Sequence, residues 1–203
     1  MILFLHFCFI MLSRNRNKMA LEHPNFFKEW LRINFFSCHL RDTLAYDNVL
    51  DLCCGWGFYL KVNPQAWGVD IDSKCIEYLS GRGYNVKECN VIEELPFPEN
   101  SFDLVLAHDA LEHFTISQVE CIFDNARRVL KKEGIFMVII PNRKGYEYGI
   151  KIGSGHRHFI TLKEIQQIST GRFVLKKSFH YPLPEFIGKH FTHNKEIILL
   201  KRI

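Results

Sequence analysis

The sequence predicts an α/β fold with a doubly wound, mostly parallel sheet of seven strands, an antiparallel last strand and helices on both faces. From residue 48 onward, short apolar runs alternate with segments whose apolar residues have helical spacing. A glycine-containing turn, Cys54-Gly55-Trp56-Gly57, follows the first run. The link between the last two runs is too short for a crossover helix, so these two strands should pair antiparallel.

Each predicted strand is a short apolar run. The runs are Asn48–Leu52, Ala66–Asp70, Asn85–Cys89, Phe102–Ala107, Gly134–Ile140, Phe173–Phe179 and Glu196–Lys201. Apolar residues at helical spacing predict the helices Pro24–Phe36, Cys75–Ser80, Ser117–Leu130 and Thr161–Ile168. Because strands and helices alternate, the sheet should be buried on both faces.

The length of 203 residues suits one domain with a well-buried core. Residues 1–18 are an apolar run followed by basic residues, too short to span a membrane, and Met19 is an alternative natural start. We expect residues 19–203 to form one domain, with a helical lid at residues 19–47 and a core at residues 48–203. No transmembrane segment is expected.

The charge balance and the cysteines exclude little and suggest a cytoplasmic protein. Lys+Arg 26 against Asp+Glu 22 is too mild an excess to indicate nucleic-acid binding by itself. The seven cysteines form no CxxC pair, so their spacing predicts no metal site. We expect them to be reduced and mostly buried thiols.

The exit of the first strand is the strongest site signal in the chain. In a doubly wound sheet, ligands bind outside the carboxyl ends of the strands. Gly55 and Gly57 allow a sharp turn and a close approach to a ligand, and the helix expected next would add free N–H groups. Asp70 follows Asp51 at close to the ~20 residues typical of an acid that binds ribose hydroxyls. These residues predict a nucleotide-like ligand, with Asp72 as the alternative acid.

Further motifs follow in order, and together they resemble the class I S-adenosylmethionine-dependent methyltransferases with a type 11 methyltransferase domain. The segments that carry the resemblance are Val49–Gly57, Gly68–Asp72, Asn90–Asp103, Ala107–His113, Arg128–Gly134 and His156–Glu164. The resemblance runs from about Asn48 to the C-terminus. It implies a Rossmann-like fold, methyltransferase activity and S-adenosylmethionine as the cofactor.

The resemblance also implies a role for each matched position. The first motif would hold the methionine part of the cofactor, the second the ribose and the third the adenine, while the fourth-strand motif would line the pocket near the sulfonium. In that order the residues are Asp51, Cys53, Gly55, Gly57, Asp70, Ile71, Asn90, Val91, Ala107 and His108.

Two residues depart from the family pattern. Cys53 stands where the family usually has glycine, so its Cβ must fit the turn and cofactor affinity or pose should differ. Asn90 stands where the family often has aspartate, which removes a charge. Both departures leave open a binding module that has lost turnover. An NAD-dependent oxidoreductase is a weaker alternative. The dinucleotide-binding motif of such enzymes has a third glycine or alanine, whereas this chain has Phe58-Tyr59-Leu60 after Gly57.

Methyl transfer from a sulfonium needs alignment and exclusion of water, and a base only where the acceptor loses a proton. The candidate bases are His108, Asp109, His113 and His156. Glu112 and His113 are equally compatible with a structural pair, and Tyr146 and Tyr148 are expected in the loop beyond the fifth strand. The chain has little sequence outside the core, so we expect a small-molecule acceptor, with RNA as a weaker alternative.

Overall fold

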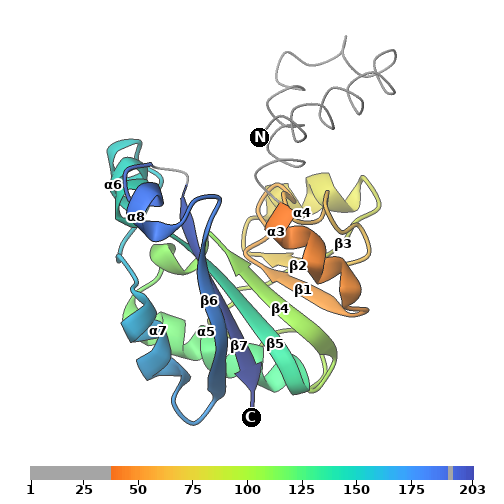
Figure 1. Ribbon diagram of the computed structural model, residues 1–203. Coiled ribbons are helices and arrows are strands. Elements are labelled where there is room, and N and C mark those ends of the chain that lie inside the picture. The colour runs from red at the N-terminus through yellow and green to blue at the C-terminus, as the bar shows by residue number, and fades with distance from the viewer. Residues whose placement is uncertain (1–37, 192–193) are drawn as a thin grey trace, which may run out of the picture. The chain divides into compact units, whose positions relative to one another are not determined.

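The computed structural model describes residues 38–191 and 194–203, which contain a seven-stranded sheet of order β3-β2-β1-β4-β5-β7-β6 (Figure 1). β7 is antiparallel to both of its neighbours, and the other pairs are parallel. The predicted fold class and its antiparallel last strand are confirmed. The extension at residues 1–18, the predicted helix Pro24–Phe36 and most of the expected lid lie outside the described residues.

Every predicted strand is present. The strands are β1 Val49–Leu52, β2 Trp67–Asp70, β3 Asn85–Glu88, β4 Phe102–His108, β5 Leu130–Pro141, β6 Phe173–Tyr181 and β7 Lys195–Arg202. β5 begins before the expected Gly134, because Leu130 already pairs with Phe102 ahead of a register shift in β4.

The two faces of the sheet bury different sets of side chains, as expected for a largely parallel sheet. In β5 the alternation is visible: Phe136, Val138 and Ile140 belong to one core cluster, whereas Ile135, Met137 and Ile139 belong to the other. The first cluster includes the apolar faces of α5 and α7. The second includes residues of α3, α4 and the segment after β1.

Most of the described helices are short, and three of them lie outside the predicted helix ranges. Their bounds are α3 Cys38–Arg41, α4 Ser73–Ser80, α5 Ile116–Val129, α6 Arg143–Lys151, α7 Leu162–Ser169 and α8 Glu185–Gly188, with 3-10 turns η1 Asp42–Ala45 and η2 Leu111–His113. Capping boxes at Thr115 and Thr161 begin α5 and α7. The predicted threonine cap of α7 is therefore present. No helix of the described residues is both long and apolar enough to cross a bilayer.

α6 and the segment after β1 differ from expectation. Tyr146 and Tyr148 lie in α6 rather than in a loop, because Asn142 caps this helix by accepting a hydrogen bond from Gly145 N. After Gly57 the chain makes successive turns, with hydrogen bonds such as Lys61 N to Gly57 O, instead of the expected helix. Tyr59 is nevertheless buried, so the segment still covers the sheet.

Candidate active site

A cavity of about 330 Å³ lies at the carboxyl ends of the parallel strands. Its lining residues follow β1, β2, β3 and β4; they are Cys53, Asp70, Ile71, Cys89, Asn90, Val91, Asp109, Ala110, His113 and Phe114. Since β2 and β4 lie on opposite sides of β1, the strand order reverses here, which is where doubly wound sheets bind ligands. The volume falls in the ~300–1,000 Å³ range of small-molecule sites.

The structure brings half of the predicted cofactor residues to this cavity: Cys53, Asp70, Ile71, Asn90 and Val91 line it. The other five are not among its lining residues. Asp51 and Ala107 are buried in β1 and β4, and Gly55 and Gly57 shape the turn beside it with φ angles of 50° and 74°. The fifth, His108, contacts other residues, described below.

Asp70 fixes the turn after β1 to the end of β2. Its Oδ2 accepts a hydrogen bond from Gly55 N at 2.8 Å, and its Oδ1 accepts one from Asp72 N at 2.9 Å. Each carboxylate oxygen retains acceptor capacity for a ligand hydroxyl, because a carboxylate offers about four lone-pair sites. Asp72, the alternative acid, instead caps α4 by accepting from Lys74 N.

The carboxyl groups of Asp51 and Asp70, near the end of β1, suit a cationic ligand. Asp51 is 3% exposed, and burial together with the nearby Asp70 carboxylate raises the pKa of its carboxyl well above the usual range. A positive group such as the ammonium of S-adenosylmethionine would favour the ionised form of this pair. The buried Asp51 carboxyl, next to the half-buried Asp70 that lines the cavity, therefore fits this cofactor.

Cys53 explains why a glycine is usual at its position. Its φ is 56°, in the left-handed region that disfavours side chains. Burial, reinforced by the Asp70 and Asp51 carboxylates, raises the pKa of its thiol, so it remains a protonated wall of the cavity. The expected departure at this residue is thus located in the cavity itself.

The polar edge of α5 holds the loop that carries Asn90 and Val91. Asn125 Nδ2 donates to Val91 O at 3.0 Å, and the Arg128 guanidinium donates to Leu95 O at 2.6 Å and to Phe97 O at 2.9 Å. Sequence reasoning missed these anchors, because Asn125 and Arg128 lie more than 30 positions from the loop that they hold. Asn90 itself donates to Glu93 Oε1 at 2.9 Å.

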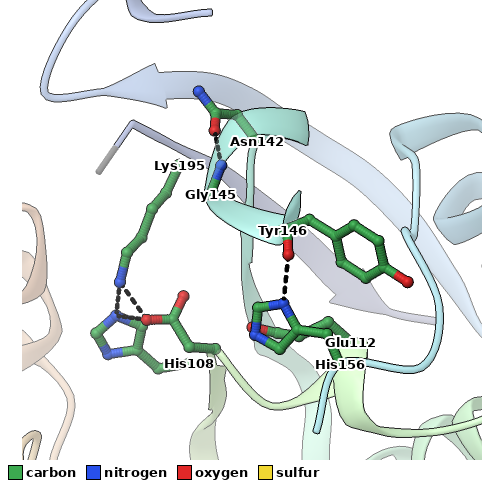
Figure 2. Close-up of polar contacts among 8 residues, drawn as sticks. His108, Glu112, Asn142, Gly145, Tyr146, His156 and Lys195 are labelled. Carbon is green, nitrogen blue, oxygen red and sulfur yellow. Dashed lines mark hydrogen bonds and ion pairs between the residues drawn. The ribbon is translucent and has the colours of Figure 1, made fainter. Parts of the chain in front are cut away.

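Two of the candidate bases meet a lysine that the sequence analysis did not consider (Figure 2). Lys195, the first residue of β7, donates to Asp109 Oδ2 and lies with Nζ 2.8 Å from His108 Nε2. The His108 ring also contacts the ring of Phe58, with centroids 5.4 Å apart. His108 is therefore engaged with β7 and with the segment after β1, while Asp109 reaches both Lys195 and the cavity.

The other two candidates, His113 and His156, lie near Glu112, and Figure 2 shows the contacts of His156. His156 Nε2 lies 3.8 Å from Glu112 Oε1, its Nδ1 lies 3.0 Å from Tyr146 O, and the ring of Tyr146 stacks on it. His113 packs edge-on against His156 and lines the cavity. Burial lowers the pKa of His113, so its ring is neutral near pH 7.

A family model described as a methyltransferase domain matches residues 50–138 of the chain. The match covers β1 to most of β5, and with them every residue that lines the cavity.

Several curated proteins that are similar in sequence are also named as methyltransferases. An uncharacterized methyltransferase of Synechocystis is 36% identical over 104 residues, 47% of this chain and 47% of that protein. A probable tRNA methyltransferase 9B of Bos taurus is 28% identical over 134 residues, 65% of this chain and 27% of that protein. A phosphoethanolamine N-methyltransferase of Plasmodium falciparum is 31% identical over 99 residues, 44% of this chain and 37% of that protein. The chain thus spans about a quarter to a half of the length of these relatives.

Solved structures agree in fold. The crystal structure of a SAM-dependent methyltransferase from Archaeoglobus fulgidus superposes with a TM-score of 0.65 at 18% identity, over 87% of this chain and 98% of that one. Geranyl diphosphate methyltransferase in complex with SAM gives a TM-score of 0.64 at 15% identity, over 81% and 83% of the two chains. Residues 50–138 of the chain are thus similar to a methyltransferase domain, and the described fold is similar to that of solved methyltransferases.

Proposed function

We propose that this chain transfers a methyl group from S-adenosylmethionine to a small-molecule acceptor, and that both bind in the cavity at the carboxyl ends of β1 to β4. The observation that carries the proposal is the position of Asp70: it ends β2, lines the cavity and is fixed by the turn after β1. We assign the ribose to Asp70, the adenine to the wall formed by Asn90 and Val91, and the methionine part to the region of Asp51 and Cys53.

The cofactor supplies an already activated methyl group, so the protein has to position the reactants and exclude water. Such positioning contributes roughly 7–11 kcal/mol in well-oriented reactions. Apolar residues around the cavity, including Val91, Ala110 and Phe114, provide a surface that excludes water. The turn after β1 and the loop held by α5 provide rigid supports for the two ends of the cofactor.

Any side chain that removes a proton from the acceptor must reach the cavity. Of the four candidate bases, Asp109 and His113 line it. His113 is neutral near pH 7 and can accept a proton, whereas Asp109 also pairs with Lys195. The proposal therefore narrows the bases to these two and assigns supporting roles to His108 and His156.

A small acceptor is favoured by the size of the cavity and by the mild charge balance of the chain. The relatives named as probable tRNA methyltransferases keep RNA as the second candidate acceptor. A macromolecular acceptor would place only its reactive group in the cavity and would bind mainly across the surrounding surface.

Calorimetry with S-adenosylhomocysteine tests cofactor binding first. Labelled S-adenosylmethionine is then incubated with the protein and a small-molecule extract or an RNA fraction, and the labelled product is identified by mass. Label in a small molecule that survives ribonuclease supports the proposal. Label that ribonuclease removes assigns RNA. Cofactor binding without labelling of any fraction supports a binding module, and stabilisation by NAD instead of S-adenosylhomocysteine overturns the assignment.

A further inference from the structure

Three side chains with metal-binding donor atoms meet beside the cavity. Glu112 and His113 belong to η2, and His156 lies in the segment between α6 and α7. Each offers a donor atom within 4.8 Å of the donor atoms of the other two. The rings of His113 and His156 have centroids 5.0 Å apart, and Figure 2 shows His156 beside Glu112. Residues far apart in the sequence therefore form one cluster.

The backbone keeps this cluster assembled. Glu112 O accepts hydrogen bonds from Arg157 N at 2.7 Å and from His158 N at 3.3 Å, so η2 and the second segment are directly joined. The ring of His113 is hydrogen-bonded to the backbone of Gly155 in the same segment. These bonds hold the backbone of η2 against the segment that carries His156, and they involve no ligand.

The carboxyl group of Glu112 lacks a complete set of partners. The residue is 2% exposed, and its Oε2 has no hydrogen-bond partner among the described residues. A buried polar atom without a partner is costly, and a buried carboxylate more so. A cation between Glu112 and the two imidazoles would remove both costs.

His156 is oriented as a ligand would be. Its Nδ1 lies 3.0 Å from Tyr146 O, a geometry in which Nδ1–H donates and Nε2 keeps its lone pair. That Nε2 is the nitrogen nearest Glu112. Metal-binding histidines commonly donate their second ring nitrogen to a carbonyl in this way. Gly149 leaves room for the ring, since a Cβ there would lie 2.0 Å from His156 Cε1.

We propose that Glu112, His113 and His156 bind a divalent transition-metal ion, with Zn²⁺ or Co²⁺ as the best matched. Two imidazoles and one carboxylate suit these ions, whereas Mg²⁺ prefers oxygen ligands alone. Tetrahedral bonds of about 2.0–2.1 Å to Zn²⁺ require donor atoms roughly 3.4 Å apart. His156 Nε2 and Glu112 Oε1 are already 3.8 Å apart, so this pair closes only slightly.

The remaining coordination position would face the cavity, because His113 lines its wall. With the ion bound, His113 is a ligand and not a base. A coordinated acceptor hydroxyl or water would instead lose its proton more readily, since a bound divalent cation lowers its pKa. The site thus adds a way to bind and ionise an oxygen acceptor, but metal binding itself does not depend on the proposed methyl transfer.

The test is a titration of the chelator-treated full chain with Co²⁺, followed by visible absorption, and with Zn²⁺, followed by calorimetry. We expect one equivalent of metal bound through nitrogen and oxygen. Glu112→Gln and His156→Gln should each weaken binding by at least tenfold. The matched control is His158→Gln: His158 pairs with Glu164 at 2.9 Å outside the cluster and should leave binding unchanged.

Several outcomes would overturn the site. The first is the absence of stoichiometric metal binding. The second is that Glu112→Gln and His156→Gln bind the metal as tightly as the His158→Gln control. The third is a thiolate-to-cobalt absorption band, which would assign the metal to cysteines. Circular dichroism checks that each variant is folded. If Glu112→Gln does not fold, His113→Gln at the partly exposed cavity wall gives the decisive comparison. A protein that binds S-adenosylhomocysteine but no metal refutes this site and leaves the proposed function intact.

Discussion

Asp70→Asn is the sharpest test of the cofactor assignment, because the substitution keeps the shape of the side chain and removes its charge. Asp70 accepts from Gly55 N and Asp72 N, at 2.8 and 2.9 Å, and it lines the cavity. A hydrogen bond to a charged group contributes about 1.5–3 kcal/mol, and ~1.4 kcal/mol is a tenfold change in affinity. Loss of the charged ribose acceptor should therefore weaken S-adenosylhomocysteine binding by at least about tenfold.

The matched control is Asp72→Asn, which makes the same charge change two residues away. Asp72 caps α4, and asparagine is an equally good cap, so binding should change by less than about threefold. Calorimetry gives both affinities, and urea unfolding checks that the turn after β1 survives. An analogue without ribose hydroxyls should bind the wild type and Asp70→Asn almost equally. Unchanged affinity of the folded Asp70→Asn protein for S-adenosylhomocysteine would refute the ribose assignment.

Three other predictions concern supporting residues. Burial lowers the pKa of His39 to about 4, so the stability it contributes is complete above pH 6.5 and is lost toward pH 4. In urea titrations over that range, His39→Gln should lose about 3 kcal/mol less than the wild type. Cys53→Gly relieves a left-handed φ that costs about 1–2 kcal/mol, while the greater entropy of the unfolded chain costs about 0.4–1 kcal/mol. The Tm of this variant should therefore not fall, and it should bind S-adenosylhomocysteine more tightly. Arg128→Met should weaken that binding several-fold and speed hydrogen exchange in residues 90–97, while an unchanged exchange rate would argue against its anchoring role.

Local patterns predicted the sheet well because each strand is a short apolar run bounded by polar or turn residues. α6 was missed for a physical reason. Its sequence contains Gly145 and Gly149, which have low helix propensity, and its apolar face is narrow. Gly149 is nevertheless required, because any side chain there would collide with His156. A tertiary contact therefore overrides the local preference.

The site was predictable where its residues are contiguous and not where they come from distant segments. Cys53 directly follows β1, Asp70 ends β2 and Asn90 lies two residues after β3, so strand prediction alone brought them to one edge of the sheet. Lys195 contacts His108 from 87 positions away, and Arg128 supports the loop after β3 from the last turn of α5. No short motif encodes such pairs, since they depend on strand order and on helix orientation.

The segment after β4 shows why one motif need not make one site. Its consecutive side chains leave the sheet in different directions: His108 meets Lys195 and Asp109 reaches the cavity, whereas Glu112 is buried against His156 and His113 returns to the cavity. Asp109, with a positive φ of 50°, still contacts Lys195 as His108 does, and it also lines the cavity. Because the same few residues join β7, the segment before α7 and the ligand cavity, a change at Glu112 acts first on how the cavity wall is held. Because His113 lines the cavity, we expect a change there to affect ligand binding more directly, so effects on stability and on binding can be separated within a single motif.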